Sequence, residues 1–297
     1  KNTSTIYEIA AHKDYQHLGI GRNLLWSVPT PVRLKVTQDN KHANTFYQSL
    51  NMRLTGTEQG RKRPLNVYEL KSLFIYCQGN NKKFPLIAQH CGVGYGTRSD
   101  EKAQSYPFML DINWEEYDWK CHLKAIMDYR PVMVCAPDYT DKSQYDDLMG
   151  KIAELRALGV IRIVVVPKFK SAVKDIPEDC VIGISIPSSY AGYVPDDEDT
   201  ALIRGRYVHL LGGSPKAQRE FYRDYTAHGI HVISADGNGF QRNCSFGMYF
   251  EDGKWKRPTY GKFAFGDMYG GMKHSLKNIV SYLHGDDYQI KLIERES

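Results

Sequence analysis

The sequence lacks the features that mark membrane proteins, disulfide-stabilised proteins and zinc proteins. No stretch approaches the about 18 consecutive apolar residues that a membrane-spanning helix requires, and no secretory signal pattern opens the sequence. The six cysteines are widely spaced and form no Cys-x-x-Cys pair, which argues against a disulfide framework or a zinc site. We therefore expect a cytoplasmic protein with reduced thiols, no metal site and no membrane association.

A large excess of one charge is also absent. The net charge is +5, and the apolar content of 42% and charged content of 25% are typical of a soluble globular protein. Compact basic groups do occur, at residues 61–63, 168–170 and 254–257, and two of them contain an aromatic residue. Such groups suit a nucleic-acid backbone and unstacked bases, but each can equally be an ordinary solvated loop.

Residues 1–71 differ in pattern from residues 72–297, which predicts two domains. In the first part, a short strand over residues 6–10 leads through a polar turn to a Gly-x-Gly and an apolar helix start. A second strand, "VRLKVT", is followed by the helical stretch "DNKHANTFYQSLNM". Glycines between a strand and a helix let backbone N–H groups approach a pyrophosphate.

These elements resemble the C-terminal half of the GCN5-related N-acetyltransferases, so we predict a partial unit of that kind. The resemblance implies an acetyl-CoA site, with Tyr47 at the position that often serves as general acid. The cofactor-binding positions that it assigns are Gln16, Gly19, Gly21, Asn40 and Tyr47. A vestigial α/β unit that serves only for packing remains the alternative.

From residue 73 onward, apolar runs rich in β-branched residues alternate with amphipathic stretches. Continuous apolar runs of this kind are typical of parallel strands buried on both faces. The predicted strands are residues 73–77, 107–112, 131–137, 161–167, 181–187, 206–213 and 231–236, with a less certain one near residues 86–89. The predicted helices are residues 114–129, 145–158 and 215–228. This pattern predicts a (β/α)8 TIM-like barrel, in the α/β class, preceded by the small α/β unit.

In such a barrel, the chemistry gathers at the C-terminal ends of the strands. Acids follow or end several predicted strands there, namely Asp111, Asp138 and Asp236. Asp236 ends the strand "HVISAD" and enters a Gly-Asn-Gly turn, so it is either a catalytic carboxylate or a turn former that points to water. The expected substrate-contacting residues around this rim are Asp138, Lys168, Ser188, Ser189, Tyr190, Gly212, Gly213, Asn238 and Phe240.

The order of these motifs resembles the tRNA-guanine transglycosylase superfamily, including its DNA-acting, base-exchanging relatives, over about residues 73–250. The most specific match is "RYVHLLGGSP", followed by "GIHVISADG". The resemblance implies that Asp236 is the nucleophile or ion stabiliser, that Asp111 is the acid/base, and that Asp138 accepts hydrogen bonds from the base.

Cleavage of an N-glycosidic bond fits this set of residues. One carboxylate can stabilise the oxocarbenium-like charge on the sugar, while a second, buried acid stays protonated near neutral pH and assists the departing base. The base must leave its stack to reach such a pocket. We therefore predict a glycosylase or base-exchanging transglycosylase that acts on a modified base in DNA rather than RNA, in a phage or anti-phage setting. The barrel itself requires no cofactor for this chemistry.

Two other classes of function remain open. The chain can be an acyl-CoA-dependent N-acyltransferase that modifies a nucleobase or a protein, with the barrel as the substrate receptor. It can also be a non-catalytic nucleic-acid-binding protein, whose binding would depend on salt but not on the rim acids.

Overall fold

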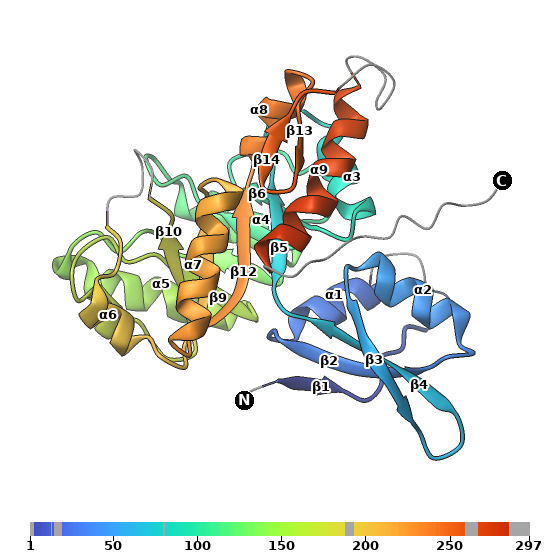
Figure 1. Ribbon diagram of the computed structural model, residues 1–297. Helices are drawn as coiled ribbons and strands as arrows, with labels where there is room; N and C mark the ends of the chain where they lie inside the picture. Colours follow the sequence, from blue (N-terminus) through green and yellow to red (C-terminus); the bar gives the residue numbers. More distant parts are fainter. Residues whose placement is uncertain are drawn as a thin grey trace.

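The computed structural model describes residues 3–12, 14, 20–79, 81–187, 193–258 and 267–284. A closed barrel of eight strands forms the larger part, and a small four-stranded sheet precedes it in the chain (Figure 1). The predicted α/β fold, with a TIM-like barrel and a small α/β unit before it, is confirmed. The boundary predicted between residues 71 and 72 lies in the short connection between the last strand of the sheet and the first strand of the barrel.

All neighbouring strands of the barrel are parallel, and the last strand pairs with the first to close the ring. The strands are β5 (Leu73–Cys77), β6 (Gly94–Arg98), β7 (Met109–Asp111), β8 (Met133–Cys135), β9 (Arg162–Val165), β10 (Val181–Ser185), β11 (Tyr207–Leu211) and β12 (His231–Gly237). Each predicted barrel strand other than the uncertain one overlaps an observed strand.

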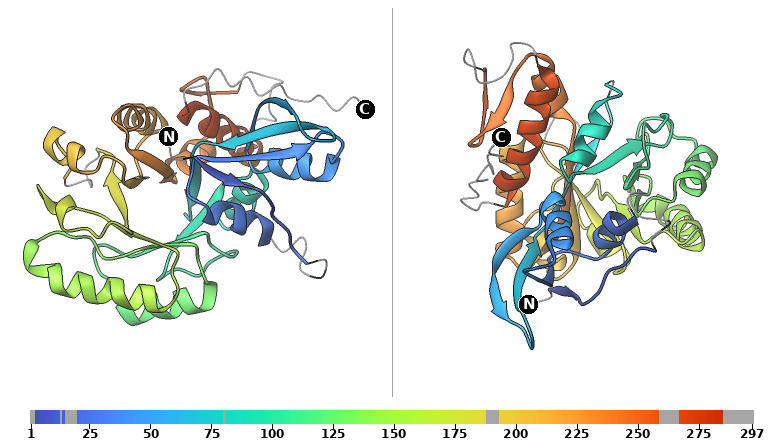
Figure 2. Two further views of the ribbon diagram at one scale, coloured as in Figure 1. Left: turned by 90° about the horizontal axis from the view of Figure 1, so that it is seen from below. Right: turned by 90° about the vertical axis from the view of Figure 1, so that its right-hand side faces the viewer.

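Helices cover the outside of the barrel, and the views in Figure 2 show them around the strands. They are α3 (Phe84–His90), α4 (Trp119–Tyr129), α5 (Tyr145–Ala157), α6 (Asp197–Leu202), α7 (Pro215–Ala227), α8 (Gly239–Ser245) and α9 (Met268–Leu283). A hairpin of β13 (Tyr249–Glu251) and β14 (Lys254–Lys256) lies between α8 and α9. Within the described ranges, no helix is both long and apolar enough to cross a bilayer.

The eighth strand was predicted in the wrong place. Residues 86–89 lie in α3, and the strand is β6, whose sequence "GYGTR" has neither an apolar run nor regular alternation. Its glycines have a packing role, because a Cβ at Gly94 or Gly96 would lie 3.1 or 3.2 Å from the side chain of Ile75 on β5. Close packing inside the barrel therefore overrides the low strand propensity of glycine.

The helix predicted from residue 114 begins later, at Trp119. The Asp118 side chain accepts a hydrogen bond from the Cys121 N–H group and so caps the helix at that point. Residues 112–118 consequently form a loop at the C-terminal end of β7. The helix predicted from residue 215 begins there, and the Ser214 side chain caps it by accepting from the Ala217 N–H group.

The small unit is a mixed sheet in the order β1-β2-β4-β3 with two helices. Its elements are β1 (Ser4–Ile6), α1 (Ile20–Ser27), β2 (Val32–Thr37), α2 (Lys41–Ser49), β3 (Arg53–Gln59) and β4 (Pro64–Leu70). The first strand was predicted at residues 6–10, but β1 pairs with β2 only from Ser4 to Ile6. Beyond that point β1 and β2 separate, and residues 9–11 line a pocket instead.

The small unit closes the N-terminal mouth of the barrel. The side chains of Leu25 and Trp26 on α1 share one hydrophobic core with residues at the start of the barrel strands. Trp26 meets Phe108, just before β7, edge to face at a ring distance of 5.7 Å. Thr30 donates to the Ile233 carbonyl at 3.1 Å. The opposite, C-terminal mouth carries the predicted acids.

Candidate active site at the C-terminal mouth of the barrel

Strand alternation places a polar layer inside the barrel near its C-terminal end. Ile75, Met109 and Met133 belong to the core that fills the barrel interior. Because side chains two residues apart lie on the same face of a strand, Cys77, Asp111 and Cys135 also face inward, one step closer to the mouth. The interior is therefore apolar at the N-terminal end and polar at the C-terminal end.

Asp236 lies at the end of β12 and is only 6% exposed. Its Oδ1 accepts a hydrogen bond from the Gly212 N–H group at 2.8 Å, and its Oδ2 accepts one from the Cys77 thiol at 2.8 Å. His209 Nε2 lies 3.7 Å from Oδ1. The alternative in which Asp236 forms a turn and points to water is thus wrong, since its carboxylate faces hydrogen-bond donors inside the mouth.

Asp111 enters the same mouth from β7. Its Oδ1 accepts the Ile112 N–H group at 2.8 Å, and it also forms a hydrogen bond with Cys135. Burial raises the pKa of Asp111 to about 7, and the nearby charge of Asp236 acts in the same direction. Asp111 can therefore hold a proton near neutral pH, as a general acid must.

Asp138 completes the group of acids, on the loop after β8. Lys168 Nζ lies 3.3 Å from Asp138 Oδ2 and donates to Ser185 Oγ at 3.1 Å. Burial raises the pKa of Asp138, while the charge of Lys168 opposes this shift. The charge of Asp138 also acts on Asp111. The structure thus brings Asp111, Asp138, Asp236 and Lys168 together.

The glycine pair after β11 has the backbone conformation that favours glycine. Gly212 and Gly213 have φ of 64° and 79°, and a Cβ on Gly213 would lie 2.3 Å from Ile186 Cγ2. The buried Gln218 donates from Nε2 to the Gly212 carbonyl at 2.7 Å and to the Asp236 carbonyl at 2.5 Å. Gln218 therefore fixes the loop that carries the N–H group bound to Asp236.

Sequence reasoning missed the residues that surround the two acids. Cys77 and Cys135 were interpreted as ordinary core thiols, and His209 was not considered at all. The signal that could have found them is the two-residue period, which places each on the inner face of its strand near the mouth. Burial and neighbouring carboxylates raise the pKa of both thiols, so they are protonated donors rather than thiolate nucleophiles.

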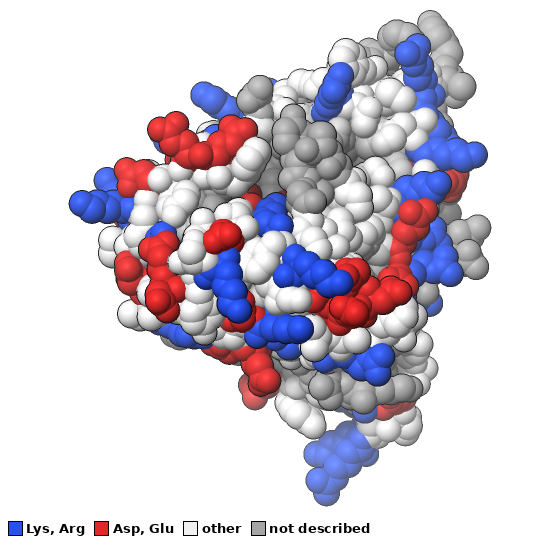
Figure 3. Space-filling view, turned by 90° about the vertical axis from the view of Figure 1, so that its left-hand side faces the viewer, with Lys and Arg blue, Asp and Glu red and all other residues white. Residues whose placement is uncertain are grey.

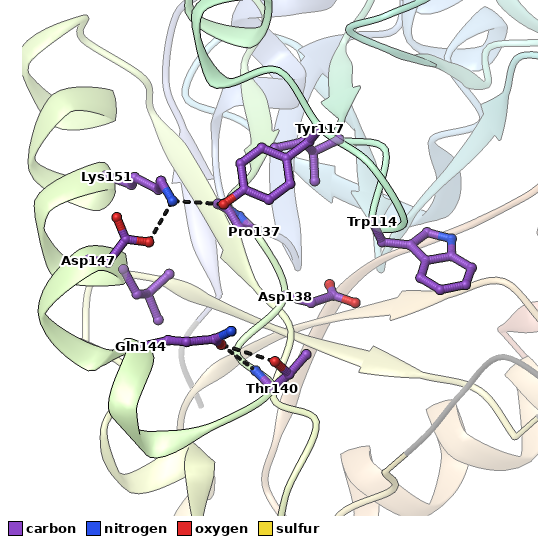
Figure 4. Close-up of a pocket in the computed structure, with 10 residues that line it drawn as sticks. Trp114, Tyr117, Pro137, Asp138, Thr140, Gln144, Asp147 and Lys151 are labelled. Carbon is purple, nitrogen blue, oxygen red and sulfur yellow. Dashed lines mark hydrogen bonds and ion pairs between the residues drawn. The ribbon is translucent and has the colours of Figure 1, made fainter.

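A pocket of about 140 Å³ adjoins Asp138 (Figure 4). Trp114 and Tyr117, on the loop after β7, line it and are 56% and 39% exposed. Thr140 and Gln144, on the loop after β8, line it as well. Exposed aromatic rings beside a carboxylate offer both a stacking surface and a hydrogen-bond acceptor to a planar ligand.

Phe240, another predicted site residue, does not join the acids. Phe240 is 3% exposed and packs against Phe74 and Tyr76, so it is a core residue and not a stacking surface at the rim. Asn238 is exposed at the N-cap of α8, and within the described chain its side chain makes no capping hydrogen bond. Ser188, Ser189 and Tyr190 lie outside the described residues.

A second pocket, of about 510 Å³, is lined by residues 9–11, by the helices α1 and α2 of the small unit and by the end of α3. Gly21 and Tyr47, both predicted cofactor-binding residues, line it together with Arg22. Asn40 caps α2 by accepting from the Ala43 N–H group at 3.0 Å, and burial raises the pKa of Tyr47. Gln16 and Gly19 lie outside the described residues.

Among the described residues, no group of three or more His, Cys, Asp or Glu side chains is arranged to hold a metal ion.

No curated protein matches the sequence significantly. A family described as a family of unknown function (DUF6610) matches residues 88–284, which span α9 and all the barrel strands except β5. The match covers well over half of the chain, so this protein belongs to the DUF6610 family.

Proposed function

We propose that the protein cleaves the N-glycosidic bond of a nucleobase in DNA, as a glycosylase or a base-exchanging transglycosylase. The observation that carries the proposal is the pairing of two interior acids with different surroundings. Asp236 has hydrogen-bond donors on both carboxylate oxygens, the Gly212 N–H group and the Cys77 thiol. Asp111 has a pKa raised to about 7, which favours its protonated form.

The two acids divide the chemistry between them. As the bond from C1′ to the base nitrogen breaks, its electron pair leaves with the base, and that nitrogen takes the proton of Asp111. The positive charge that develops on the sugar is stabilised, or trapped as an ester, by the carboxylate of Asp236. Water or an incoming base then attacks C1′, and Asp111, now ionised, accepts the proton that this nucleophile loses.

Asp236 Oδ2 is the oxygen directed to the sugar. Its Oδ1 is held by the Gly212 N–H group, whereas Oδ2 is contacted by the thiol of Cys77, which is a weaker donor. Cys77 is also only partly buried. The pocket beside Asp138, with Trp114 and Tyr117, has the aromatic surface that an unstacked base would need.

Mass spectrometry of bases released from a panel of modified and unmodified DNAs tests the proposal. We expect release by the wild-type protein and by Asp128→Asn, which changes an exposed acid on α4. We expect Asp236→Asn to lower the rate on the order of a thousandfold, because the sugar cation loses its counter-charge. Wild-type activity in Asp236→Asn would remove Asp236 from the mechanism. DNA binding without release from any substrate would favour a non-catalytic binding protein.

The pocket of the small unit favours a second candidate, an acyl-CoA-dependent N-acyltransferase. It is lined by Gly21 on α1 and by Tyr47 on α2. Calorimetric titration with acetyl-CoA tests this function: saturable binding that Gly21→Val weakens would support it. The valine enters the pocket because a Cβ at Gly21 already lies 3.2 Å from Phe46 Cζ. Absence of heat at millimolar acetyl-CoA would end it.

A further inference from the structure

A fully buried histidine lies beside Asp236 inside the barrel. His209, on β11, is 0% exposed. Its Nδ1 lies 2.8 Å from the hydroxyl oxygen of Ser234, and its Nε2 lies 3.7 Å from Asp236 Oδ1. Within the described chain, Nε2 has no hydrogen-bond partner at normal distance, so the carboxylate of Asp236 is the polar group that it faces.

Two charged groups act on this imidazole from other strands of the barrel, one on the adjacent β12 and one on β9, two strands away. Asp236 on β12 favours the imidazolium, whereas Arg162 on β9 disfavours it. Arg162 is itself 5% exposed, and one of its terminal nitrogens lacks an acceptor among the described residues. Burial is the largest influence and, together with Arg162, lowers the pKa of His209. The ring is therefore neutral near neutral pH.

The carboxylate of Asp236 selects the tautomer of the neutral ring, and the hydroxyl of Ser234 can pair with Nδ1 in that tautomer. A neutral imidazole carries one N–H group, and its other nitrogen accepts. If Nδ1 carried the hydrogen, the lone pair of Nε2 would face the carboxylate of Asp236, which is repulsive. When Ser234 instead donates to Nδ1, the hydrogen lies on Nε2 and faces Asp236 Oδ1.

We propose that His209 is the positioning residue for Asp236: an imidazole whose Nε2–H group faces Oδ1, with Ser234 donating to Nδ1, while Oδ2 faces the sugar. The expected effect of His209 on the rate rests on the proposed function, whereas the tautomer assigned to its ring does not. Together with the Gly212 N–H group, His209 fixes the rotation of the carboxylate. Catalytic hydrogen bonds are often long in an unliganded enzyme and shorten when substrate binds, which fits the separation of 3.7 Å.

Kinetics of base release test the positioning role. We expect His209→Phe to lower kcat on the order of a hundredfold with KM little changed, because the carboxylate loses its orientation. His209→Gln restores a side-chain N–H group and should recover most of that loss. His122→Phe is the matched control, since His122 is equally buried at 0% exposure but lies on α4. Equal losses in His209→Phe and His209→Gln, or a change in KM alone, would overturn the assignment.

Nitrogen-15 NMR of the histidine rings provides a readout that does not depend on activity. We expect His209, identified by the signal missing in His209→Gln, to be in the Nε2–H form between about pH 7 and 8. Asp236→Asn, whose amide can also donate to Nε2, should allow the other tautomer to appear. An Nδ1–H or imidazolium form in the wild-type protein would overturn the assignment, even if His209→Phe fails to fold. A wild-type protein that releases no base but shows the Nε2–H form would contradict the proposed function and leave the ring assignment intact.

Discussion

The two interior acids show how neighbours give one residue type two roles. Asp236 lies among donors from β5, β11 and the loop after β11, so its carboxylate is solvated by the protein in place of water. Asp111 is buried and lies in the field of Asp236, and both influences raise its pKa to about 7. Separate environments for paired acids are what glycosidic-bond cleavage requires.

The raised pKa of Asp111 predicts the pH dependence of base release. Because the acid must be protonated to assist the departing base, the rate should fall as the pH rises through about 7. Asp111→Asn should lower the rate about 10²- to 10⁴-fold and abolish this limb of the profile, which initial rates between acid and alkaline pH would measure. A limb that persists in Asp111→Asn would assign it to another group.

The same shift predicts a change in stability. The folded protein binds the Asp111 proton more tightly than the unfolded chain, in which this side chain has its ordinary pKa of 3.8. The stability that this group contributes is therefore lost as the pH rises from about 4 to about 7. Asp111→Asn removes the titration and should be more stable than wild type near pH 8, by about 1–3 kcal/mol. Urea unfolding of both proteins at several pH values measures the gap. A gap that does not widen with pH would contradict the shift.

The acids could be predicted from the sequence because each ends or follows a strand whose apolar run is easy to recognise. The thiols and His209 could not be, because Cys and His inside apolar strands are most often packing residues. Their role depends on which strands lie opposite one another across the barrel. Phe240 illustrates the converse, since its place after β12 suggested the rim but its ring turns into the layer of helices around the barrel.

At the scale of elements, the loop between β11 and α7 is fixed by its shape more than by its composition. Gly213 has φ of 79° and no room for a side chain next to Ile186. Gln218, on the first turn of α7, binds carbonyls of both this loop and β12. The loop is therefore a rigid link between the N–H group that binds Asp236 and the strand that carries Asp236.

Substitution of Gly213 separates backbone strain from steric contact. Gly159 has a similar φ of 77°, but among the described atoms nothing lies within 4 Å of its Cβ position. Gly159→Ala should cost about 1–2 kcal/mol in the free energy of unfolding, from backbone strain alone. Gly213→Ala should cost about 1–3 kcal/mol more, because Ile186 must move. Equal costs in chemical denaturation would show that the loop accommodates the methyl group freely.

The elements themselves were largely predictable. Apolar runs identified the barrel strands other than β6, and the long helices α5 and α7 begin at the predicted residues. The exceptions have physical causes that act over long distances in the chain. The glycines of β6 leave room for the side chain of Ile75 on the neighbouring β5. The first strand of the chain pairs only up to Ile6, and residues 9–11, predicted as strand, line a pocket.

At the scale of the whole molecule, the two units share a core. The small sheet is joined to the barrel by contacts of α1 with the N-terminal mouth and by Asn51, whose side chain donates to the Cys91 carbonyl at 2.7 Å.

Basic and acidic side chains alternate over the face shown in Figure 3, so the charges there do not form one continuous basic surface. The division of the chain could be predicted, but the shared core depends on side chains from both units meeting at one mouth.

The shared core predicts cooperative unfolding. Trp26→Ala removes a ring that is 3% exposed and packs on Phe108, so it should lower the stability of the whole chain by about 3–5 kcal/mol in a single transition. Leu24→Ala, on the same helix but 45% exposed, should change it little. Circular dichroism and tryptophan fluorescence should give coincident curves. Separate transitions, with the barrel unaffected by Trp26→Ala, would show that the units fold independently.

Because the small unit closes the N-terminal mouth, the barrel is open to solvent at one end only. A molecule that reaches Asp111 and Asp236 therefore enters past the loops at the C-terminal mouth and leaves by the same opening. In a base-exchange reaction, the released base therefore leaves the barrel before the incoming base binds. The sugar stays bound to the enzyme between these two steps. In double-reciprocal plots with the concentrations of the DNA and of the incoming base both varied, the lines should then be parallel. Intersecting lines would require a second entrance to the site.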